Sequence, residues 1–300
     1  MNKGILAGIG AYFLWGLFPI YWRLLETVPA LEILANRIVW SLVFTVGLLI
    51  LQKDLLWWKT IRHNRRVLLI YTLAALLLSV NWFVYIWAVN AGYVVEASLG
   101  YFINPLVNFM LGVIFFKEKL RSGQVVAVIL AVLGVLYLTF NYGHLPWISL
   151  VLAFTFGMYG LIKKSAPLES MHGFSLETAV MFLPALVFLL YRGASGVGAL
   201  GTQSTAVTAL LVLAGPVTSI PLLLFGYAAR RIPLSMLGFI QYIAPTLQFL
   251  LGVYVYQEPF PASRLIGFCI IWLALIFYSL ESVYYNRKLK LRPSLVEPLE

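Results

Sequence analysis

Two stretches of the chain read PLVNFMLGVIFFKE over residues 105–118 and PTLQFLLGVYVYQE over residues 245–258. They align without a gap at a shift of 140 residues, and six of the fourteen aligned positions are identical: Pro, Phe, Leu, Gly, Val and Glu. Self-similarity at a fixed shift is typical of an internal repeat. The two halves of the chain are therefore expected to share one architecture.

The composition places these apolar runs in a lipid bilayer. Of the 300 residues, 62% are hydrophobic and only 11% are charged, and the mean hydropathy is +0.92. A soluble domain has about 45–50% apolar and about 25% charged residues, so a water-soluble enzyme is excluded. Runs such as 125–137 are continuous and lack the alternation of a β-barrel strand. The sequence predicts an all-α integral membrane protein.

Ten membrane spans are expected, because a bilayer-crossing helix needs roughly 20 apolar residues. Cutting the chain at charge clusters and turn residues gives spans at 4–24, 32–52, 67–89, 95–116, 122–140, 145–162, 174–192, 206–229, 234–256 and 262–285. They form two five-helix repeats, 1–143 and 144–285, followed by a basic tail, 286–300. Because five is an odd number, the second repeat must cross the membrane in the opposite sense to the first.

The cations alternate between the connections. Of the 21 Lys and Arg residues, 17 fall at the N-terminus, in the loops after the even-numbered spans, or in the tail. Lys163 and Lys164 are assigned to the loop after the sixth span. Cytoplasmic segments carry an excess of Lys and Arg, so both termini are expected in the cytoplasm. Such cations contact anionic lipid, and no nucleic-acid partner is expected.

Inverted repeats are typical of secondary transporters, in which the substrate site lies at the repeat interface near the bilayer midplane. Exchanging the conformations of two such halves exposes a shared site to each side in turn. The alternative from a different class is a non-transporting membrane scaffold or sensor. A scaffold would move no solute and would tolerate Asn104→Leu and Gln248→Leu.

Four strings carry a resemblance to a known family: YFLWGLFP (12–19), EILANRIVWS (32–41), NWFVYIWAVN (81–90) and SLGYFINPL (98–106). With the repeated Pro…Gly…Glu signature, they resemble the RarD permeases, the chloramphenicol-sensitive protein family in the EamA-like branch of the drug/metabolite transporter superfamily. The resemblance covers essentially the whole chain. It implies ten helices around a central cavity, and export or exchange of a small organic solute across the bacterial inner membrane. It does not identify the substrate.

Arg37 is the clearest embedded charge, and polar groups at membrane depth are functional candidates because they are costly there. It lies five residues past the start of the second span, with Glu32 five residues before it. The guanidinium must face a wet cavity or a carboxylate. It either binds a substrate anion or acts in coupling, or it forms a structural ion pair with Glu32 or another acid. If a proton gradient drives transport, Glu32 or Glu96 is expected to titrate.

The fourth span and its repeat partner each carry a polar stripe on one helical face. The residues of the two stripes are Tyr101, Asn104, Asn108, Gln241 and Gln248. Pro105 and Pro245 each remove the hydrogen bond to the carbonyl four residues earlier, so they are expected to act as hinges. The stripes are expected to line the substrate cavity. The alternative is that the amides hydrogen-bond across helices and hold the packing.

A small set of aromatic residues lies deeper than the interfacial belts. Tyr12 and Trp15 share one face of the first span, and Trp82 and Tyr85 lie with Asn81 on the third. Rings with a polar edge suit a planar, partly apolar organic substrate. These residues are therefore further candidates for the cavity lining, with simple packing as the alternative for each ring.

Glu118 and Glu258 end the fourth and ninth spans, close to the N-terminus of the following span. A carboxylate in that position satisfies free N–H groups and the helix dipole. Helix capping is therefore the expected role of both residues, in preference to proton transfer.

Sequence motifs of enzymes and pumps are missing. The chain contains no G-x-x-x-x-G-K-[ST] and no H-E-x-x-H, and Asp54 is its only aspartate. No catalytic residue, cofactor or metal site is expected, because these motifs supply phosphate and zinc binding. The expected partners are a small-molecule substrate and the lipid bilayer. The fifth and tenth spans are poorest in polar residues, and they are expected to support the others from outside or to pair subunits in a homodimer.

Overall fold

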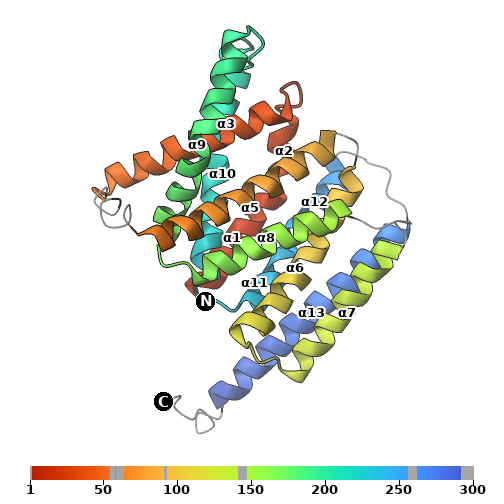
Figure 1. Cartoon of the computed structure of the whole chain (residues 1–300). Helices are drawn as coiled ribbons and strands as arrows, with labels where there is room; N and C mark the ends of the chain where they lie inside the picture. Colours follow the sequence, from red (N-terminus) through yellow and green to blue (C-terminus); the bar gives the residue numbers. More distant parts are fainter. Residues whose placement is uncertain are drawn as a thin grey trace.

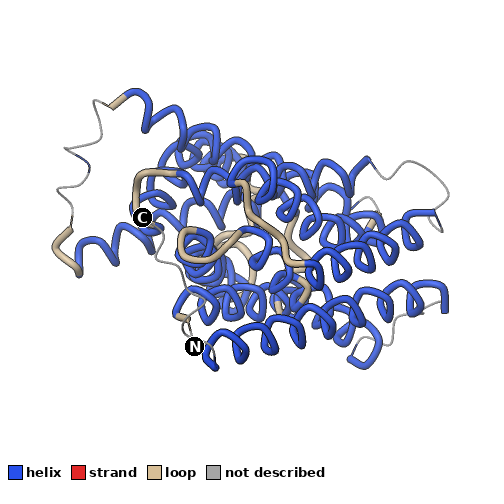
Figure 2. Tube along the Cα trace, turned by 90° about the horizontal axis from the view of Figure 1, so that it is seen from below, coloured by secondary structure: helices blue, strands red, loops and turns tan. Residues whose placement is uncertain are grey.

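The computed structural model describes residues 2–54, 58, 64–90, 93–140, 147–255 and 262–291. Within these ranges the regular structure is helical and no strand occurs (Figure 2). The helices are α1 (Lys3–Gly16), α2 (Phe18–Arg23), α3 (Ala30–Leu51), α5 (Arg65–Asn90), α6 (Val94–Phe116), α7 (Ser122–Phe140), α8 (Trp147–Ser165), α9 (Ser170–Ala194), α10 (Thr205–Ala229), α11 (Leu234–Gln241), α12 (Ile243–Leu250), the π-helix η1 (Leu251–Val255) and α13 (Ala262–Leu291). The all-α prediction is confirmed for the described residues.

Among the described residues, eight helical segments are long and apolar enough to cross a bilayer. They are Lys3–Arg23, Ala30–Leu51, Arg65–Tyr85, Leu99–Phe116, Ser122–Phe140, Trp147–Ser165, Ser170–Ala194 and Thr205–Ala229. The ninth expected span is divided into α11, α12 and η1, and α13 contains a shorter apolar stretch, Leu265–Glu281. The chain is a multi-pass membrane protein, and the count of ten spans stays a prediction.

The division of the ninth expected span follows from the missing amide hydrogen of Pro245. This residue cannot donate to the carbonyl of Gln241, and α11 ends there, with Tyr242 separating it from α12. Pro105 removes the related hydrogen bond in the first half, yet α6 continues through it as one helix. The two halves therefore differ in helix continuity at these related prolines.

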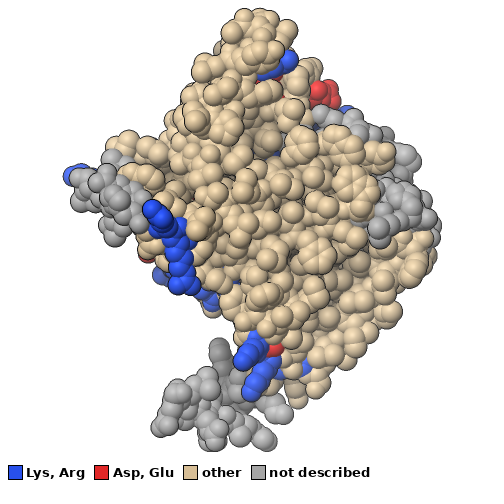
Figure 3. Space-filling view, in the orientation of Figure 1, with Lys and Arg blue, Asp and Glu red and all other residues tan. Residues whose placement is uncertain are grey.

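The exposed surface of the long helices is apolar. Leu183, Leu190 and Leu280 expose 66%, 63% and 65% of their surface, whereas Glu32 and Glu177 are each 1% exposed. This distribution is the reverse of that in a soluble protein and fits a chain surrounded by lipid. The described Lys and Arg residues seen in Figure 3 gather mainly on the side where α1 begins and α13 ends (Figures 1 and 3).

Two cations were misplaced by the sequence prediction, since Lys164 as well as Lys163 lies in the last turn of α8 and not in a loop. Lys163, expected in a loop, lies in the last turn of α8 and is only 3% exposed. Burial at this position is possible because a carboxylate from α9 pairs with the ammonium group, as described below.

Contacts between helices interleave the two halves of the chain. α6 packs along α8, and α1 packs along α10, α11 and α12. α3 lies against α9 and α10, while α5 lies against α8 and α9. α6 also meets α11, and α7 pairs with α13 on one flank of the assembly (Figure 1). The halves therefore do not form two separate bundles, and α7 and α13 occupy the outer position expected for the fifth and tenth spans.

Two glycines allow close helix crossings next to the candidate site. A Cβ on Gly215 of α10 would overlap the Trp40 carbonyl of α3, and a Cβ on Gly238 of α11 would lie 2.7 Å from the Pro105 carbonyl oxygen of α6. Small residues let helix backbones approach each other in membranes. Thr218 follows Gly215 by one turn and Gln241 follows Gly238 by one turn, so each of these polar residues is brought close to the facing helix.

Candidate functional site

Arg37 is a buried cation at the meeting point of four helices. It lies on α3 and is 6% exposed, and its Nε donates a hydrogen bond of 3.0 Å to Thr218 Oγ1 on α10. The guanidinium carbon lies 4.6 Å from the ring centre of Trp22 on α2 and 4.5 Å from that of Trp82 on α5. Elements from both halves of the chain therefore surround this charge.

Among the described residues, no carboxylate forms an ion pair with Arg37. Glu32, the partner considered from the sequence, is instead bound to Arg192 of α9, with 3.3 Å between Oε2 and Nη2. The other oxygen of Glu32 accepts a hydrogen bond from the Ala199 amide. The structural Arg37–Glu32 ion pair is therefore not formed. Whether Arg37 pairs with another acid or faces a cavity stays a prediction.

The contacts of Arg37 do not balance the cost of its burial. Removing an ion from water costs several kcal/mol, whereas a cation–π contact contributes about 0.5–2 kcal/mol and a typical hydrogen bond about 1 kcal/mol. Arginine has five N–H donors, and the described residues accept a hydrogen bond from only one of those on Arg37. The phenol groups of Tyr21, Tyr85 and Tyr101 lie within electrostatic range of the guanidinium. Within the part of the chain that the structure describes, Arg37 thus has one hydrogen-bond acceptor and no counter-charge.

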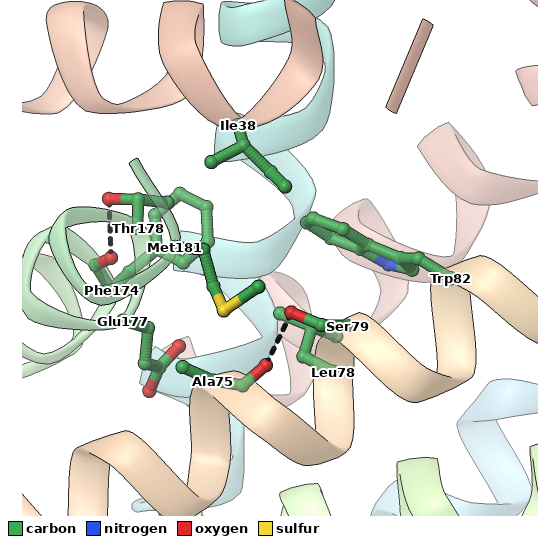
Figure 4. Close-up of a pocket in the computed structure, with 9 residues that line it drawn as sticks. All are labelled: Ile38, Ala75, Leu78, Ser79, Trp82, Phe174, Glu177, Thr178 and Met181. Atoms are coloured by element: carbon green, nitrogen blue, oxygen red, sulfur yellow. Dashed lines mark hydrogen bonds between the residues drawn. The ribbon is translucent and has the colours of Figure 1, made fainter. Parts of the chain in front are cut away.

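A small pocket is lined in part by Trp82, the same side chain that lies against the Arg37 guanidinium. Figure 4 shows it enclosed by α3, α5 and α9, with Met181 between Trp82 and Glu177. The lining residues are Ile38, Ala75, Leu78, Ser79, Trp82, Phe174, Glu177, Thr178 and Met181. The hydroxyls of Ser79 and Thr178 donate to carbonyls of their own helices, so the lining is mainly apolar. Its volume is about 10 Å³, which is room for roughly one water molecule, so these side chains close on one another in this structure.

A buried ion pair borders this pocket. Lys163 Nζ lies 2.9 Å from Glu177 Oε1, and the Tyr159 hydroxyl donates a 3.0 Å hydrogen bond to Oε2. The Lys163 and Glu177 side chains are 3% and 1% exposed. None of the three was predicted as a site residue. The available signal was the repeat itself, because Glu177 lies 140 residues after Arg37, the shift that aligns the two halves.

The predicted polar stripes meet where α6 crosses α11. Asn108 Nδ2 donates to Gln241 Oε1 at 2.9 Å and to Asn104 Oδ1 at 3.1 Å, and the Tyr12 hydroxyl lies 3.4 Å from Gln241 Oε1. Asn104 Nδ2 donates to the Ala153 carbonyl of α8 at 2.7 Å. All four polar side chains are buried. They hydrogen-bond α1, α6, α8 and α11 together, and their part in lining a substrate cavity stays a prediction.

Two other predicted amides also hydrogen-bond to neighbouring helices. Asn81 Nδ2 donates to the Leu152 carbonyl and to the Thr155 hydroxyl of α8, both at 2.9 Å. Gln248 Nε2 donates to the Trp15 carbonyl of α1 at 3.2 Å. These contacts are those that the alternative interpretation, packing by interhelical amides, describes.

The predicted aromatic residues separate into two groups. Tyr85 and Tyr101 form an edge-to-face pair with ring centres 5.7 Å apart, beside the buried guanidinium. Tyr12 and Trp15 lie 5.3 Å apart, and Trp15 continues to Phe156 at 5.5 Å within the hydrophobic core. The first group is therefore near the candidate binding charge, while the second belongs to helix packing.

Glu118 caps a helix, as predicted, but not the next one in the chain. Its carboxylate accepts hydrogen bonds from the amides of Leu234 at 2.7 Å and Ser235 at 3.0 Å, at the start of α11, and from the Ser235 hydroxyl at 2.6 Å. The capped helix thus belongs to the other half of the chain. The side chain of Glu96 and the whole of Glu258 lie outside the described residues.

Polar contacts join α3 to α9 at both ends. Glu32, in the first turn of α3, contacts Arg192 in the last turn of α9. At the other end, His172 Nε2 in the first turn of α9 lies 2.8 Å from Asp54 Oδ2, shortly after α3. Positions 32 and 172 are themselves related by the 140-residue shift. The two helices are therefore linked by related contacts at opposite ends.

Comparison with known proteins places the chain in a family. The EamA-like transporter family matches residues 2–140. The uncharacterized transporter YojE of Bacillus subtilis is 47% identical over 96% of this chain and 97% of the relative. Protein RarD of Streptomyces exfoliatus is 47% identical over 99% and 94%, and protein RarD of Escherichia coli K12 is 42% identical over 96% and 97%.

The fold also recurs in a solved structure. One crystal structure matches with a TM-score of 0.70 and 19% sequence identity, covering 93% of this chain and 98% of that chain. At this identity the likeness concerns the fold alone. The family assignment rests on these three near full-length relatives, each of which exceeds 40% identity. The chain therefore belongs to the EamA-like transporters of the drug/metabolite transporter superfamily, as a RarD-type permease.

Proposed function

We propose that this protein is a secondary transporter that moves a small organic solute, a drug or a metabolite, by alternating access between two inverted five-helix repeats. The repeats comprise residues 1–143 and 144–285, and residues 286–300 form a basic cytoplasmic tail. Both termini lie in the cytoplasm, and the bacterial inner membrane is the location. The direction is export or exchange.

The pattern of helix contacts is the observation that carries this proposal. Exchanging the halves replaces α1 by α8, α3 by α9, α5 by α10, α6 by α11 and α12, and α7 by α13. The α6–α8 contact then becomes the α1 contact with α11 and α12, α3–α10 becomes α5–α9, and α1–α10 becomes α5–α8. The contacts α3–α9, α6–α11 and α7–α13 map onto themselves. Such an exchange is what two related halves around a pseudo-two-fold axis produce, and the family match ends at residue 140, near the proposed boundary.

The location of the candidate site supports the same proposal. The contacts of Arg37 come from α2 and α5 of the first repeat and α10 of the second, and the adjoining pocket is lined by α3, α5 and α9. Transporters of inverted-repeat architecture bind their substrate at such an interface. Pro105 and Pro245 provide the hinges next to it in this proposal.

The linked ends of α3 and α9 supply gates for alternating access. The Glu32–Arg192 contact closes one end and the His172–Asp54 contact closes the other, and each opens in turn during the cycle. The contact with Arg192 makes Glu32 the first coupling candidate if a proton gradient drives transport. Glu96 is the second coupling candidate.

Transport is tested with right-side-out and inside-out membrane vesicles enriched in the protein. They are exposed to a broad mixture of metabolites and drugs under an imposed pH gradient, and the accumulated solutes are identified by mass spectrometry. We expect gradient-dependent accumulation that is lost in Arg37→Ala and kept in Arg231→Ala, a matched control with an exposed guanidinium. Folded protein that moves no solute in either orientation would instead indicate the scaffold or sensor.

The inverted topology has a separate test. The chain has one cysteine, Cys269, so Cys269→Ser gives a cysteine-free background. Lys117→Cys and Gln203→Cys then place single thiols at exposed positions on the two proposed sides. A membrane-impermeant maleimide added to intact cells should label position 203 and not position 117. Labelling of both positions, or of position 117 alone, would contradict the proposed orientation.

A further inference from the structure

We infer that the solute bound at Arg37 is an organic monoanion: one carboxylate attached to a flat apolar group, with no cationic group on the same molecule. This inference rests on the proposed transport function and names the substrate class of its site. It follows from the charge, the geometry and the neighbouring pocket of Arg37, each of which restricts the ligand in a different way.

The charge restricts the ligand to an anion. Two buried acids, Glu32 in the first turn of α3 and Glu177 about two turns into α9, are already neutralised by Arg192 and Lys163. Among the described residues, no carboxylate neutralises Arg37. A neutral solute would leave its charge unbalanced, and the ammonium group of a cation or zwitterion would find no free acid among these buried groups. A single negative charge completes the balance.

The geometry favours a carboxylate. The indole rings of Trp22 and Trp82 cover the guanidinium at 4.6 and 4.5 Å, and Thr218 occupies the Nε hydrogen. An incoming anion must therefore approach the remaining N–H edge of the planar group. That edge presents two parallel donors, which match the two oxygens of a carboxylate.

The pocket favours a flat apolar body. It shares Trp82 with the arginine and is bounded by Ile38, Leu78 and Met181 (Figure 4). Because its volume is about 10 Å³, a solute must displace side chains to enter. These side chains offer apolar contact, and methionine adapts its shape to different ligands. In this proposal the apolar part of the solute lies against Trp82 once Met181 has moved, and its carboxylate binds Arg37. A large or highly hydroxylated solute would leave polar groups without partners in this lining.

The inference is tested by binding to the purified protein with compounds that differ only in charge. Indole-3-acetate is compared with its neutral amide, with the cation tryptamine and with the zwitterion tryptophan; benzoate and 2-naphthoate are compared with their amides. Affinity is measured by titration calorimetry in detergent. We expect each bound acid to exceed its amide by about 10- to 100-fold, the usual effect of hydrogen bonds to a charged group. Tryptamine and tryptophan should bind no better than the amide.

Variants assign this preference to Arg37. Arg37→Gln should bind the acid and its amide equally, Arg37→Lys should keep part of the preference, and Arg231→Gln should keep all of it. The charge series on the unmodified protein decides the question even if Arg37→Gln fails to fold. Equal binding of acid and amide for every ring system, or a preference that survives in folded Arg37→Gln, overturns the inference.

The outcomes separate this inference from the proposed function. Suppose that the vesicle screen finds transport of a cation, a zwitterion or a neutral compound, and that calorimetry finds no preference for acids. The transport function is then supported and the monoanion site is contradicted. If acids bind through Arg37 but no solute crosses the membrane in vesicles, the binding site is supported and the transport function is contradicted.

Discussion

The buried pair of Lys163 and Glu177 offers the sharpest test of the packing argument. The two charges lie 2.9 Å apart with 3% and 1% of their side chains exposed. At an effective dielectric constant of about 20, their attraction is about 6 kcal/mol, which offsets much of the cost of taking both ions out of water. Glu177→Gln leaves the ammonium group buried without a counter-charge. We expect this single change to reduce the free energy of unfolding by about 3–5 kcal/mol.

The double variant distinguishes charge pairing from simple loss of contacts. Lys163→Met with Glu177→Gln removes both charges, so the desolvation cost disappears together with the attraction. Its stability should lie within about 1 kcal/mol of the unmodified protein, since neutral replacement of a whole buried pair is often tolerated. The measurement is equilibrium unfolding in mixed detergent–SDS micelles, followed by circular dichroism and tryptophan fluorescence.

The surface pair Arg121–Glu281 provides the matched control. Its nitrogen and oxygen are 2.7 Å apart, but the side chains are 29% and 17% exposed. Glu281→Gln should cost less than about 1 kcal/mol, because exposed ion pairs contribute little. If Glu177→Gln costs no more than Glu281→Gln, or if the two single losses at the buried pair simply add in the double variant, the reasoning about buried charge is refuted.

Three further predictions test the helix cap, the close crossing and the gate. Glu118→Gln weakens the cap of α11 and should cost about 1–2 kcal/mol in the same unfolding assay; a cost no greater than that of Glu281→Gln would contradict the capping role. Gly215→Leu forces α10 away from the backbone of α3 and should prevent recovery of folded protein, measured by size-exclusion chromatography, whereas a normal yield would show that the crossing is not tight. Glu32→Gln and Arg192→Gln each open one end of the α3–α9 pair and should raise maleimide labelling of a cysteine introduced nearby; unchanged labelling would remove this contact from gating.

Much of the fold was predictable because the bilayer imposes simple rules on sequence. Long apolar runs must form helices, since every backbone polar group needs a partner inside the segment. The interruption of the ninth expected span could also be located from the sequence, because the break at Tyr242 lies within one turn of Pro245. The prediction failed for Lys163, because a cation near a helix end resembles a loop residue until its buried partner on another helix is known.

The site was less predictable because its contacts join distant parts of the chain. Arg37 was identified from its depth, but its ligands Thr218 and Trp22 carry no local signal that connects them to it. The amides of Asn104 and Gln241 were predicted to lie on polar stripes, yet only tertiary structure shows that they hydrogen-bond to neighbouring helices. The sequence thus identifies polar side chains that are costly to bury in a membrane, whereas the partner of each one depends on how the helices cross.

The related positions 37 and 177 show how one repeated backbone carries two different chemistries. Arg37 lies about two turns into α3 and Glu177 about two turns into α9, and both side chains are buried. Their charges have opposite signs. Glu177 is satisfied within its own half by Lys163 and Tyr159, so its charge needs nothing from outside. Arg37 has aromatic rings and one hydroxyl in place of an acid. Because the two positions lie at equivalent places in α3 and α9, the difference between them lies in their side-chain partners. We therefore expect an external anion to bind at Arg37 and not at Glu177.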